Sequence, residues 1–535
     1  MVVLSARGLC RAAKAIAWAT AVSGAPASAD EKFDIAAYDV VGNTLLDQAT
    51  IERAVYGGLG PGQTAADVEK SRATLEAAYR ARGYESVSVD LPPQREIDGI
   101  VTIKVTEARL GTVKVTGSRY SSDTRLRRQL PSLAAGEVPD LKAAQREIAD
   151  VNRLADRQVT PLIKPGKVPG TIDIELKVRD KFPLHARVEL NNDHNPNTDP
   201  LRLVGTIRYA DLWHLGHSVS FTYIVAPQNR ANAEVYSGSY LAPIWGSQWS
   251  LLLFGYKSNS TVPSLGGTSV LGNGYDIGLR AIRQIGGGAG WQQSISFGAD
   301  YKNFNELIRL GTTTLEAPIR YVPATFSYSV SHSNDRATAS LTTAVTAGIR
   351  RIGTPDAIFA PGSTTNIIGG FASRRFGALG NFVHFNAEAE YRRNLGSDIV
   401  ADVRLAGQLA DQPLVSSEQF VSGGLGTVRG YLQSEAVGDD GGFGSIELRS
   451  PSATFLGSFV DDWRLFVFAD GAYARIRQPQ TGQTDSYTLL SVGAGTRFQF
   501  FRYVSGEAVF GHVLRGATTS REGDNRATFR VKAEF

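Results

Sequence analysis

Arg429 is the residue whose surroundings point most directly to a chemical role. It lies in the segment LGTVRGYLQSEAVGDDGG, residues 425–442, with glycines on both sides and with Val428 and Tyr431 close by. A guanidinium carries a permanent charge and a forked set of donors, so it binds a carboxylate in a fixed orientation. A soluble core rarely holds such a cation among turn residues, and an exposed loop has little need of a valine and a tyrosine. The surrounding elements must therefore explain what holds this arginine.

The other residues that could do chemistry form incomplete sites. His214 and His217 are three residues apart in HLGH, but no third metal ligand accompanies them in the sequence. Asp439 and Asp440 in GDDGG could attract a cation such as calcium, although a glycine-rich turn explains them equally well. The chain contains no G-x-S-x-G elbow, no H-E-x-x-H helix and no G-x-x-x-x-G-K-[ST] nucleotide loop. We therefore expect a protein that is not an enzyme and that uses no cofactor and no metal.

The N-terminal residues are typical of an export signal. Three basic residues precede or enter the short apolar stretch AIAWATAVSGA, and the small residues ASA at 27–29 form a cleavage site. We expect residues 1–29 to be removed, so that the mature chain begins near Asp30. The single cysteine, Cys10, lies in this segment, which leaves no cysteine for a disulfide or a thiolate metal site.

The balance of charge and hydropathy excludes two further classes of protein. The formal net charge of +4 falls to 4 − 3 = +1 when the three basic residues of 1–29 are removed. A chain so close to neutral is unlike a nucleic-acid-binding protein, so we expect no nucleic acid as a partner. No run of eighteen apolar residues follows the signal, so a role in a membrane would have to use strands.

Residues 30–180 contain one pattern twice, with a period of about 70 to 75 residues. The first copy, 30–108, and the second, 109–180, each predict a strand, two helices and two further strands. In the second copy, an apolar stripe along 141–155 predicts the longer helix. On pattern alone, two small α+β domains of any purpose remain an alternative.

After Lys181 the sequence predicts only strands. Segments of about ten residues alternate between apolar and polar positions, separated by turns rich in glycine, proline, asparagine and aspartate. We count about sixteen such segments in 181–535, an even number, as bacterial outer-membrane barrels require. The predicted fold class is therefore α+β repeats followed by an all-β transmembrane barrel of antiparallel strands.

The connections between these segments alternate in length. Short ones such as HSND and LGS match periplasmic turns, and long ones such as 352–380 and 410–441 match outer loops. The apolar face would meet lipid, and the charged face would line a wet lumen where ionic groups stay hydrated. A soluble sandwich also alternates, but such a domain rarely continues for about 355 residues without a break.

Four local features resemble those of one family. They are DLKAAQREIADVNRL with PGKVPGTIDIELKV, SSEQFVSGGLGTVRGY with GDDGGFGSIEL, FVFADGA, and the C-terminal Phe535. On these features the chain resembles the two-partner secretion transporters, the haemolysin and filamentous-haemagglutinin secretion and activation proteins (ShlB/FhaC/HecB-like) of the outer membrane protein 85 superfamily. The resemblance covers essentially the whole mature chain. It implies that the two repeats are POTRA (polypeptide-transport-associated) domains.

The resemblance also implies a site. The loop 410–441 would fold back into the barrel, where Arg429 would meet Asp470 of FAD on an inner wall. Gly426 and Gly430 would let the loop backbone turn tightly on either side of the arginine. The residues assigned to this gating lock are Arg429, Asp470, Gly430, Tyr431, Val428 and Phe468, and Phe535 is the C-terminal signature of the barrel.

Two features depart from the family pattern. The F-x-D-x-G segment ends in Ala472 instead of glycine, which bears on how closely the loop can pack there. Members of the family commonly have an N-terminal helix that plugs the pore, whereas only three residues separate Ala29 from Phe33. We therefore expect the loop 410–441 to do most of the closing of the pore.

The function implied by the resemblance is export of an unfolded exoprotein from the periplasm to the surface of a Gram-negative bacterium. The POTRA domains would recognise the secretion domain of that exoprotein, and the barrel would be its path. Lipid and the barrel assembly machinery would be further partners, and we expect a monomer. Two alternatives remain, an insertase for other barrel proteins and a passive porin. Two POTRA modules are few for an insertase and have no use in a porin.

Overall fold

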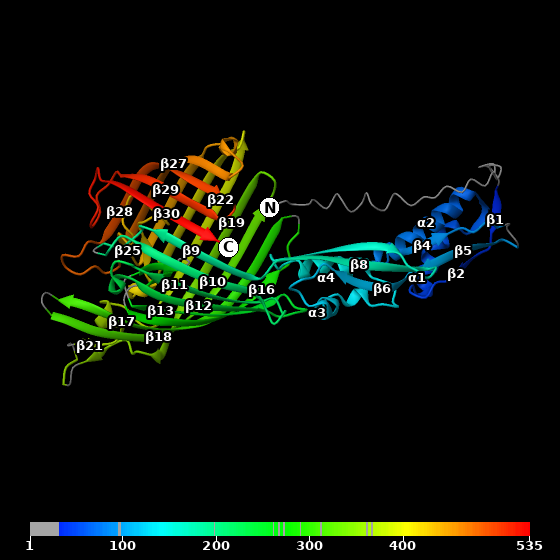
Figure 1. Cartoon of the computed structure of the whole chain (residues 1–535). Coiled ribbons are helices and arrows are strands. Elements are labelled where there is room, and N and C mark those ends of the chain that lie inside the picture. The colour runs from blue at the N-terminus through cyan, green and yellow to red at the C-terminus, as the bar shows by residue number, and fades with distance from the viewer. Residues whose placement is uncertain are drawn as a thin grey trace. The chain divides into compact units, whose positions relative to one another are not determined.

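The computed structural model of the chain describes residues 32–535, with gaps at 95–97, 197, 260–261, 266–267, 271–272, 289, 311–312, 360–361 and 365–366. The expected signal segment, 1–29, lies outside the described residues. The chain divides into two compact units that meet in sequence at Lys181 and Phe182. Figure 1 shows helices and strands in the first unit and a barrel of strands in the second.

The first module of unit one packs helices against a three-stranded sheet. Its elements are β1 (Phe33–Ile35), β2 (Ala37–Val41), α1 (Gln48–Val55), η2 (Tyr56–Gly58), β3 (Gly60–Gln63), α2 (Ala65–Ala81), β4 (Val87–Asp90) and β5 (Ile100–Glu107). The central strand β5 is parallel to β2 and antiparallel to β4. Helix α2 begins at a capping box of Thr64 and Asp67, and its Leu75 and Tyr79 are fully buried in the module's core.

The second module repeats this topology. Its elements are β6 (Arg109–Thr116), α3 (Asp123–Arg128), η3 (Pro131–Leu133), α4 (Leu141–Val151), β7 (Arg157–Pro165) and β8 (Thr171–Asp180). The central strand β8 is parallel to β6 and antiparallel to β7. Helix α4 is shorter than the predicted stripe, because Asn152 ends it and hydrogen-bonds the backbone of Val159 through both side-chain atoms. Ala155 therefore lies beyond the helix.

In each module the central strand ends in a carboxylate. This carboxylate binds the backbone just after the strand that runs parallel to the central one. Glu107 accepts hydrogen bonds from the backbone N–H groups of Thr44 and Leu45 at 2.8 and 3.0 Å. Asp180 accepts from the N–H groups of residues 119–121 at 2.7 to 3.2 Å. These two carboxylates, which we call the acidic latches, occupy equivalent positions, so the duplication extends to single hydrogen bonds.

None of the helices in the described part of the chain is both long enough and apolar enough to span a bilayer.

The second unit is a closed barrel of sixteen strands, as predicted. The strands are β9 (Leu184–Asn191), β10 (Arg202–Leu212), β11 (His217–Val225), β12 (Glu234–Pro243), β13 (Trp249–Asn259), β16 (Asn273–Ile285), β17 (Trp291–Leu310), β18 (Thr313–Ser333), β19 (Ala337–Gly353), β22 (Val383–Gly396), β23 (Ile399–Ala410), β26 (Asp440–Arg449), β27 (Val460–Arg475), β28 (Ser486–Phe500), β29 (Val504–Val513) and β30 (Asn525–Glu534). Shorter elements of the connections are η4 (Arg230–Asn232), β14 (Val262–Leu265), β15 (Thr268–Val270), β20 (Ile358–Phe359), β21 (Ile367–Gly369), α5 (Phe371–Arg374), η5 (Ser416–Glu418), β24 (Phe420–Ser422), β25 (Ala436–Gly438) and η6 (Thr454–Leu456).

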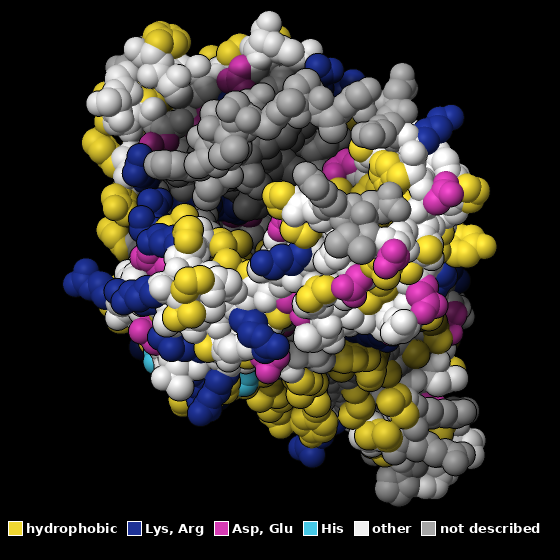
Figure 2. All heavy atoms as spheres, turned by 90° about the vertical axis from the view of Figure 1, so that its right-hand side faces the viewer, with side chains coloured by type: hydrophobic (Ala, Val, Ile, Leu, Met, Phe, Trp, Pro, Cys, Tyr) yellow, Lys and Arg dark blue, Asp and Glu magenta, His cyan; other side chains and the backbone are white. Residues whose placement is uncertain are grey.

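The two faces of the barrel strands differ as the alternation predicts. On β27, Leu465 and Val467 point outward with exposed fractions of 63% and 56%, whereas Phe468 and Asp470 point inward and are buried. Figure 2 shows a broad patch of hydrophobic side chains in the lower part of the view. An apolar exterior of this kind suits contact with lipid, and the inward face keeps the ionic groups.

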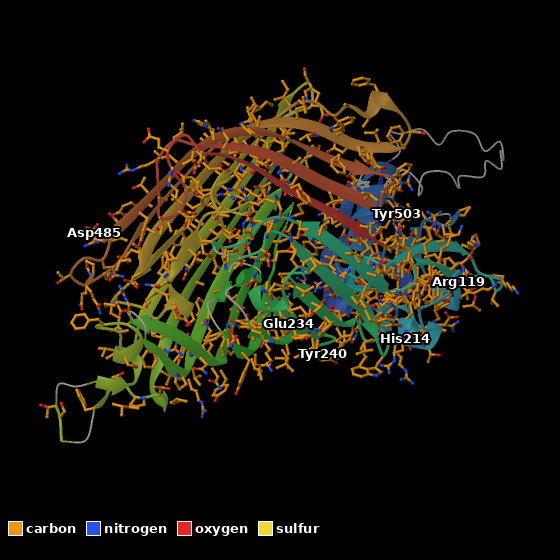
Figure 3. The ribbon with its side chains drawn as sticks, turned by 60° about the vertical axis from the view of Figure 1, so that its left-hand side comes forward. Arg119, His214, Glu234, Tyr240, Asp485 and Tyr503 are labelled. Carbon is orange, nitrogen blue, oxygen red and sulfur yellow. The ribbon has the colours of Figure 1, made fainter. Side chains whose placement is uncertain are left out.

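The connections are short at one end of the barrel and longer at the other. His214 and Tyr503, in short turns, lie at one end, and Asp485, in the connection from β27 to β28, lies at the opposite end (Figure 3). Strands β17 and β18 have 20 and 21 residues, longer than the predicted strands 291–302 and 318–331. They exceed the prediction because they remain paired with each other beyond Asn305 and Tyr321, where their pairing with the neighbouring strands ends.

Phe535 lies at the seam where the last strand meets the first. Strands β30 and β9 are joined over only five residue pairs. Beyond them, the N–H of Phe535 donates to the carbonyl of Ala186 at 2.9 Å, and the N–H of Ala186 donates to Phe535 at 3.1 Å. The Phe535 ring stacks on Tyr503 with centroids 6.0 Å apart. The C-terminal residue therefore extends a short seam.

Candidate functional site

The connection from β23 to β26, residues 411–439, packs against the inward-facing side chains of the barrel. Val428, Arg429 and Tyr431 near its turn are buried, with exposed fractions of 0%, 3% and 1%. Their contacts are with inward side chains and backbone of β26 to β29. We call this segment the lumen loop.

Arg429 forms a two-pronged ion pair with Asp470 on β27. Its Nε donates to Oδ2 at 2.7 Å, and its Nη2 donates to Oδ1 at 2.8 Å. The backbone N–H of Arg429 also donates to Oδ2, at 3.0 Å. One carboxylate thus fixes both the plane of the guanidinium and the backbone of the loop. The structure brings together the two residues that the resemblance pairs.

Two residues of β26 complete this site, and sequence reasoning missed both. Nη1 of Arg429 donates to Glu447, and Nη2 donates to Ser445 Oγ at 3.1 Å. Ser445 lies directly opposite Asp470 in the pairing of β26 with β27, so strand register was the signal that could have found it. Phe468 completes the site, because its ring centroid lies 3.7 Å from Cζ of Arg429, a cation–π contact.

Val428 and Tyr431 anchor the turn on either side of the arginine. Both pack in one apolar cluster that includes Ala472 of β27. The Tyr431 hydroxyl oxygen lies 2.9 Å from the carbonyl oxygen of Leu490 and 2.6 Å from that of Arg515, and it accepts from the Leu490 N–H at 3.0 Å. The alanine that departs from the family pattern therefore fills space in the cluster and does not hold the loop away.

Glycines make room for the loop at other positions. Gly430 has a left-handed φ of +95°, and Gly511 on β29 faces it so closely that a Cβ at Gly511 would lie 2.6 Å from the Cα of Gly430. Gly426, expected to permit a tight turn, has no left-handed φ, and Gly423 and Gly424 have it instead, at +111° and +94°. Gly426 nonetheless lies in a tight turn, because the N–H of Thr427 donates to the carbonyl of Gly424 at 3.2 Å.

The Arg429 site continues into a wider ionic network on the barrel wall. Glu447 also accepts from Arg449 Nε at 2.6 Å and from Arg497 Nη1 at 2.9 Å. Arg449 pairs with Asp402 on β23 at 2.9 Å, and Arg497 pairs with Glu507 on β29 at 3.0 Å. Carboxylates and guanidiniums that share partners in this way restrain one another. Glu447 is therefore held in a fixed position when it binds Arg429.

A further carboxylate holds the tip of the lumen loop. Asp193, in the connection from β9 to β10, accepts from the Leu425 N–H at 3.2 Å and from Gln433 Nε2 at 2.7 Å. Burial raises the pKa of Asp193 to about 6, although these two donors favour its charged form. Nearby, Glu435 of the loop accepts from the N–H of Ser520 at 2.7 Å.

The other suggestive residues serve structure. Asp439 accepts from the N–H groups of Leu414 and Arg477 at 2.8 and 2.7 Å, so it ties the base of the lumen loop. Asp440 pairs with Arg477, with Nε and Oδ2 2.7 Å apart. His217 Nδ1 lies 2.6 Å from the hydroxyl of Tyr240. Within the described ranges, no group of three or more His, Cys, Asp or Glu side chains could hold a metal ion.

Comparison with family models decides the family. A model described as haemolysin secretion/activation protein ShlB/FhaC/HecB matches residues 170–498, more than half of the chain. A model of the ShlB-type POTRA domain matches residues 33–108. The chain belongs to the ShlB/FhaC/HecB family. It is an outer-membrane transporter of two-partner secretion that exports a partner exoprotein, its POTRA region is periplasmic, and its family is one of transporters and not of enzymes.

Curated relatives align with this transporter at low sequence identity. The heme/hemopexin transporter protein HuxB of Haemophilus influenzae (strain 86-028NP) is 21% identical over 427 residues, which cover 78% of this chain and 72% of the relative. The outer membrane transporter CdiB of Dickeya dadantii (strain 3937) is 24% identical over 187 residues, which cover 34% of this chain and 33% of that one.

Solved structures share the fold. CdiB from Escherichia coli superposes with a TM-score of 0.65 at 18% identity, covering 98% of this chain and 93% of its own. BamA from Haemophilus ducreyi lacking POTRA domains 1–3 superposes with a TM-score of 0.53 at 14% identity, covering 94% of this chain and 100% of its own.

Proposed function

We propose that the lumen loop is the gate of the export path and that Arg429 and Asp470 form its lock. The observation that carries this proposal is the buried two-pronged pair, in which one carboxylate binds both the side chain and the backbone of Arg429. Removing one partner of a buried pair typically costs about 3–5 kcal/mol, because the other charge is left uncompensated. Withdrawal of the loop would open a path lined by hydrated ionic groups.

The proposal assigns partner recognition to two separate POTRA domains, 30–108 and 109–180, which precede the barrel domain 181–535. Each sheet in these domains has free edges, because β4 and β7 pair on one side only. An extended chain can add to such an edge through main-chain hydrogen bonds, which place few demands on its sequence. On β7, Ile163 is 53% exposed and is available to a bound chain.

Further partners follow from the architecture. Lipid would contact the outer face of the barrel, and the barrel assembly machinery would insert it. The transporter would act as a monomer. Export would need no nucleotide if the exoprotein folds outside and cannot return, and the chain has no Walker pattern.

The gate is tested by planar-bilayer conductance of Arg429→Ala. We expect open events to become more frequent, because Asp470 and Glu447 lose their shared guanidinium. The matched control is Arg464→Ala, since Arg464 lies on the same strand as Asp470 and pairs with Asp398 and Asp462 at 2.9 Å. Among the described residues it has no partner in the lumen loop. An unchanged Arg429→Ala pore would remove the Arg429–Asp470 pair from gating.

Recognition is tested by photo-crosslinking in cells. A crosslinking residue at Ile163 on the edge strand β7 should capture the exoprotein, and one at Lys177 on the central strand β8 should capture less. Surface proteins of the deletion strain, compared by mass spectrometry with the parent, identify which exoprotein depends on the transporter. Equal capture at both positions would contradict strand addition at this edge.

A further inference from the structure

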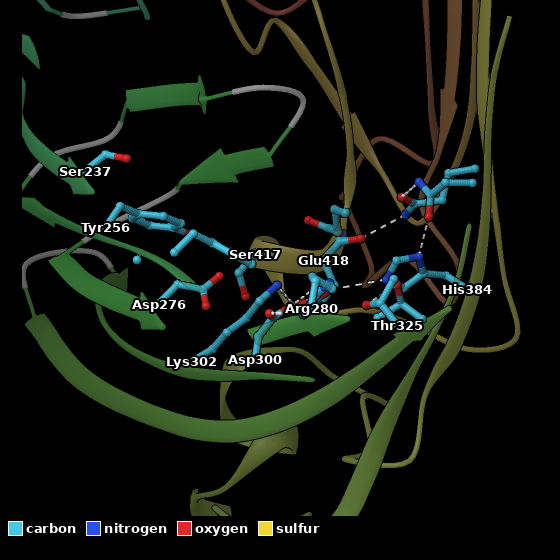
Figure 4. A pocket seen from close by; sticks show the side chains of 16 residues that line it. Ser237, Tyr256, Asp276, Arg280, Asp300, Lys302, Thr325, His384, Ser417 and Glu418 are labelled. Carbon is cyan, nitrogen blue, oxygen red and sulfur yellow. Dashed lines mark hydrogen bonds and ion pairs between the residues drawn. The ribbon is translucent and has the colours of Figure 1, made fainter. Parts of the chain in front are cut away.

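Glu418 of the lumen loop is a second buried charge on the barrel wall. Its Oε1 accepts from Lys302 Nζ on β17 at 2.6 Å and from the Tyr321 hydroxyl on β18 at 2.5 Å. Its Oε2 lies 3.2 Å from Nε2 of His384 on β22. Figure 4 shows Glu418 between Lys302 and His384, with Lys302 reaching toward it. Glu418 and Lys302 are each 6% exposed, so this contact is as enclosed as the Arg429 site.

This contact attaches a different limb of the loop to a different arc of the wall. Glu418 lies on η5, before the turn that carries Arg429, and its three partners come from β17, β18 and β22. The lock described above uses β26 and β27. Gln408 strengthens this attachment, because its Nε2 donates to the carbonyl of Glu418 at 2.9 Å.

Asp276 on β16 is the carboxylate that this arrangement leaves without a partner. Its side chain is 2% exposed, and its Oδ1 is buried with no hydrogen-bond partner among the described residues. The neighbouring Asp300 differs, because it holds Arg280 through both oxygens at 2.7 and 2.8 Å. An unpaired buried carboxylate is costly, so its persistence needs a reason.

Lys302 lies within reach of both carboxylates. Asp276 and Lys302 are direct partners in the pairing of β16 with β17, and side chains in such pairs have Cβ atoms about 4.5–5.5 Å apart. Both side chains line a cavity of about 340 Å³ that Glu418 also borders, which gives the flexible lysine room to move. In this structure the Lys302 ammonium binds Glu418.

We infer that Glu418 is a second attachment point of the gate and that Lys302 exchanges Glu418 for Asp276 when the loop withdraws. The inference rests on the proposed gating role of the lumen loop. Glu418 competes with Asp276 for one ammonium group while the loop is docked. When Glu418 leaves with the loop, Lys302 pairs with Asp276 across two neighbouring strands. Because of this exchange, Lys302 still has an ion-pair partner when the lumen is open. The free-energy cost of undocking the loop is therefore lower.

The exchange predicts opposite effects for the two carboxylates in planar bilayers. Glu418→Gln removes the loop's share of the contact, so open probability should rise by about three- to tenfold. Asp276→Asn relieves the unpaired carboxylate of the docked state and removes the partner of the undocked state, so open probability should fall by a similar factor. A contact with no exchange would leave Asp276→Asn without effect or give it the same sign as Glu418→Gln.

The double variant and a control complete the test. In the Glu418→Gln background Lys302 can pair with Asp276 in both states, so adding Asp276→Asn should shift open probability far less than it does alone. Additive effects would overturn the inference. Glu234→Gln is the control, since this carboxylate lies on the same face of β12 as the exposed Tyr236 and hydrogen-bonds Asn259 and Tyr223 instead of the lumen loop. Heat-modifiable migration in gels confirms that each variant is folded.

The outcomes separate the inference from the proposed function. If Arg429→Ala opens the pore while Glu418→Gln and Asp276→Asn leave it unchanged, the gate stands and the second attachment is refuted. If Arg429→Ala and Glu418→Gln both leave the pore unchanged, the gating role itself is refuted. Opposite shifts for Glu418→Gln and Asp276→Asn support both.

Discussion

Arg429 is compensated by groups of two neighbouring strands, β26 and β27. Asp470 takes two of its donors and its backbone N–H, Glu447 and Ser445 take others, and Phe468 covers its face. Exposed ion pairs contribute about 0–1 kcal/mol, whereas the loss of one partner from a buried pair costs about 3–5 kcal/mol. The burial of the site, more than the number of its contacts, makes it suitable for holding a gate.

Gly511 provides a test of the docked geometry that leaves the charges unchanged. In Gly511→Ala the new Cβ would lie 2.6 Å from the Cα of Gly430, so the loop must shift. We expect the docked state to lose about 1–3 kcal/mol and the open probability to rise roughly tenfold. Single-channel recording measures this change.

The control for Gly511→Ala is Gly442→Ala on β26. A Cβ at Gly442 would have its nearest neighbour, the carbonyl oxygen of Ala406, 3.8 Å away, which is an ordinary contact. Gly442→Ala should therefore conduct like the parent. Equal behaviour of the two variants would show that the close approach at Gly511 does not limit the loop.

At the scale of elements, the lumen loop is bound along its length by carboxylates of both the loop and the wall. Asp439 ties its base, Glu418 its first limb, Arg429 its turn through Asp470, and Glu435 its return. When one of these contacts breaks, the others still hold the loop. The loop therefore leaves the wall only when all of them break together. The Arg429 pair and the Glu418 contact each join a buried ion of the loop to a buried ion of the barrel wall.

The carboxyl of Asp193 should make docking depend on pH. Its pKa is raised to about 6 by burial in the docked state, and it would return toward the ordinary aspartate value of 3.8 when the loop leaves and water enters. The docked state therefore holds its proton more tightly, so docking is favoured at low pH and this advantage is lost as pH rises through about 4 to 6. We expect open probability to increase over that window.

Recordings across a pH series measure this effect, with Asp193→Asn as the comparison. The asparagine cannot ionise, so the step in open probability between about pH 4 and 6 should disappear. A step of unchanged size in Asp193→Asn would assign the titration to another group.

At the scale of the whole molecule, closure of the barrel depends on its shortest strand pair. Strands β9 and β30 share five residue pairs, whereas β29 and β30 share nine. Phe535 adds two backbone hydrogen bonds to this seam and places its ring on Tyr503. The loss of a few hydrogen bonds at this seam should therefore affect closure of the whole barrel.

Deletion of Phe535 should reduce the yield of folded barrel. The deletion removes both hydrogen bonds to Ala186 and the stacked ring, whereas Phe535→Leu keeps the backbone bonds and an apolar side chain. We expect a several-fold lower heat-modifiable fraction for the deletion and a small change for the leucine variant, measured by gel migration of membrane fractions. Equal yields of the two would exclude a role for the added backbone bonds.

Much of this architecture could be predicted from local patterns. Alternation of apolar and polar residues depends only on which face each strand residue occupies, so it indicated the number of barrel strands. The V-R-G-Y and F-x-D segments led to Arg429 and Asp470 through the family resemblance. Glu447 and Ser445 were not predicted. Their position beside Arg429 depends on the register of β26 against β27, which no local sequence pattern encodes.

The sequence by itself determined the two α+β repeats and the barrel, because periodicity and turn residues encode faces and turns locally, and its short motifs led to Arg429 and Asp470 through the family resemblance. Only the tertiary structure decided how the acidic latches repeat, which glycine admits the loop, and that Lys302 meets a glutamate 116 residues away while its neighbour Asp276 stays unpaired. Those contacts arise from barrel closure and from the inward path of the lumen loop. Both set distances between residues that are remote in the chain, and such distances exist only once the barrel is formed.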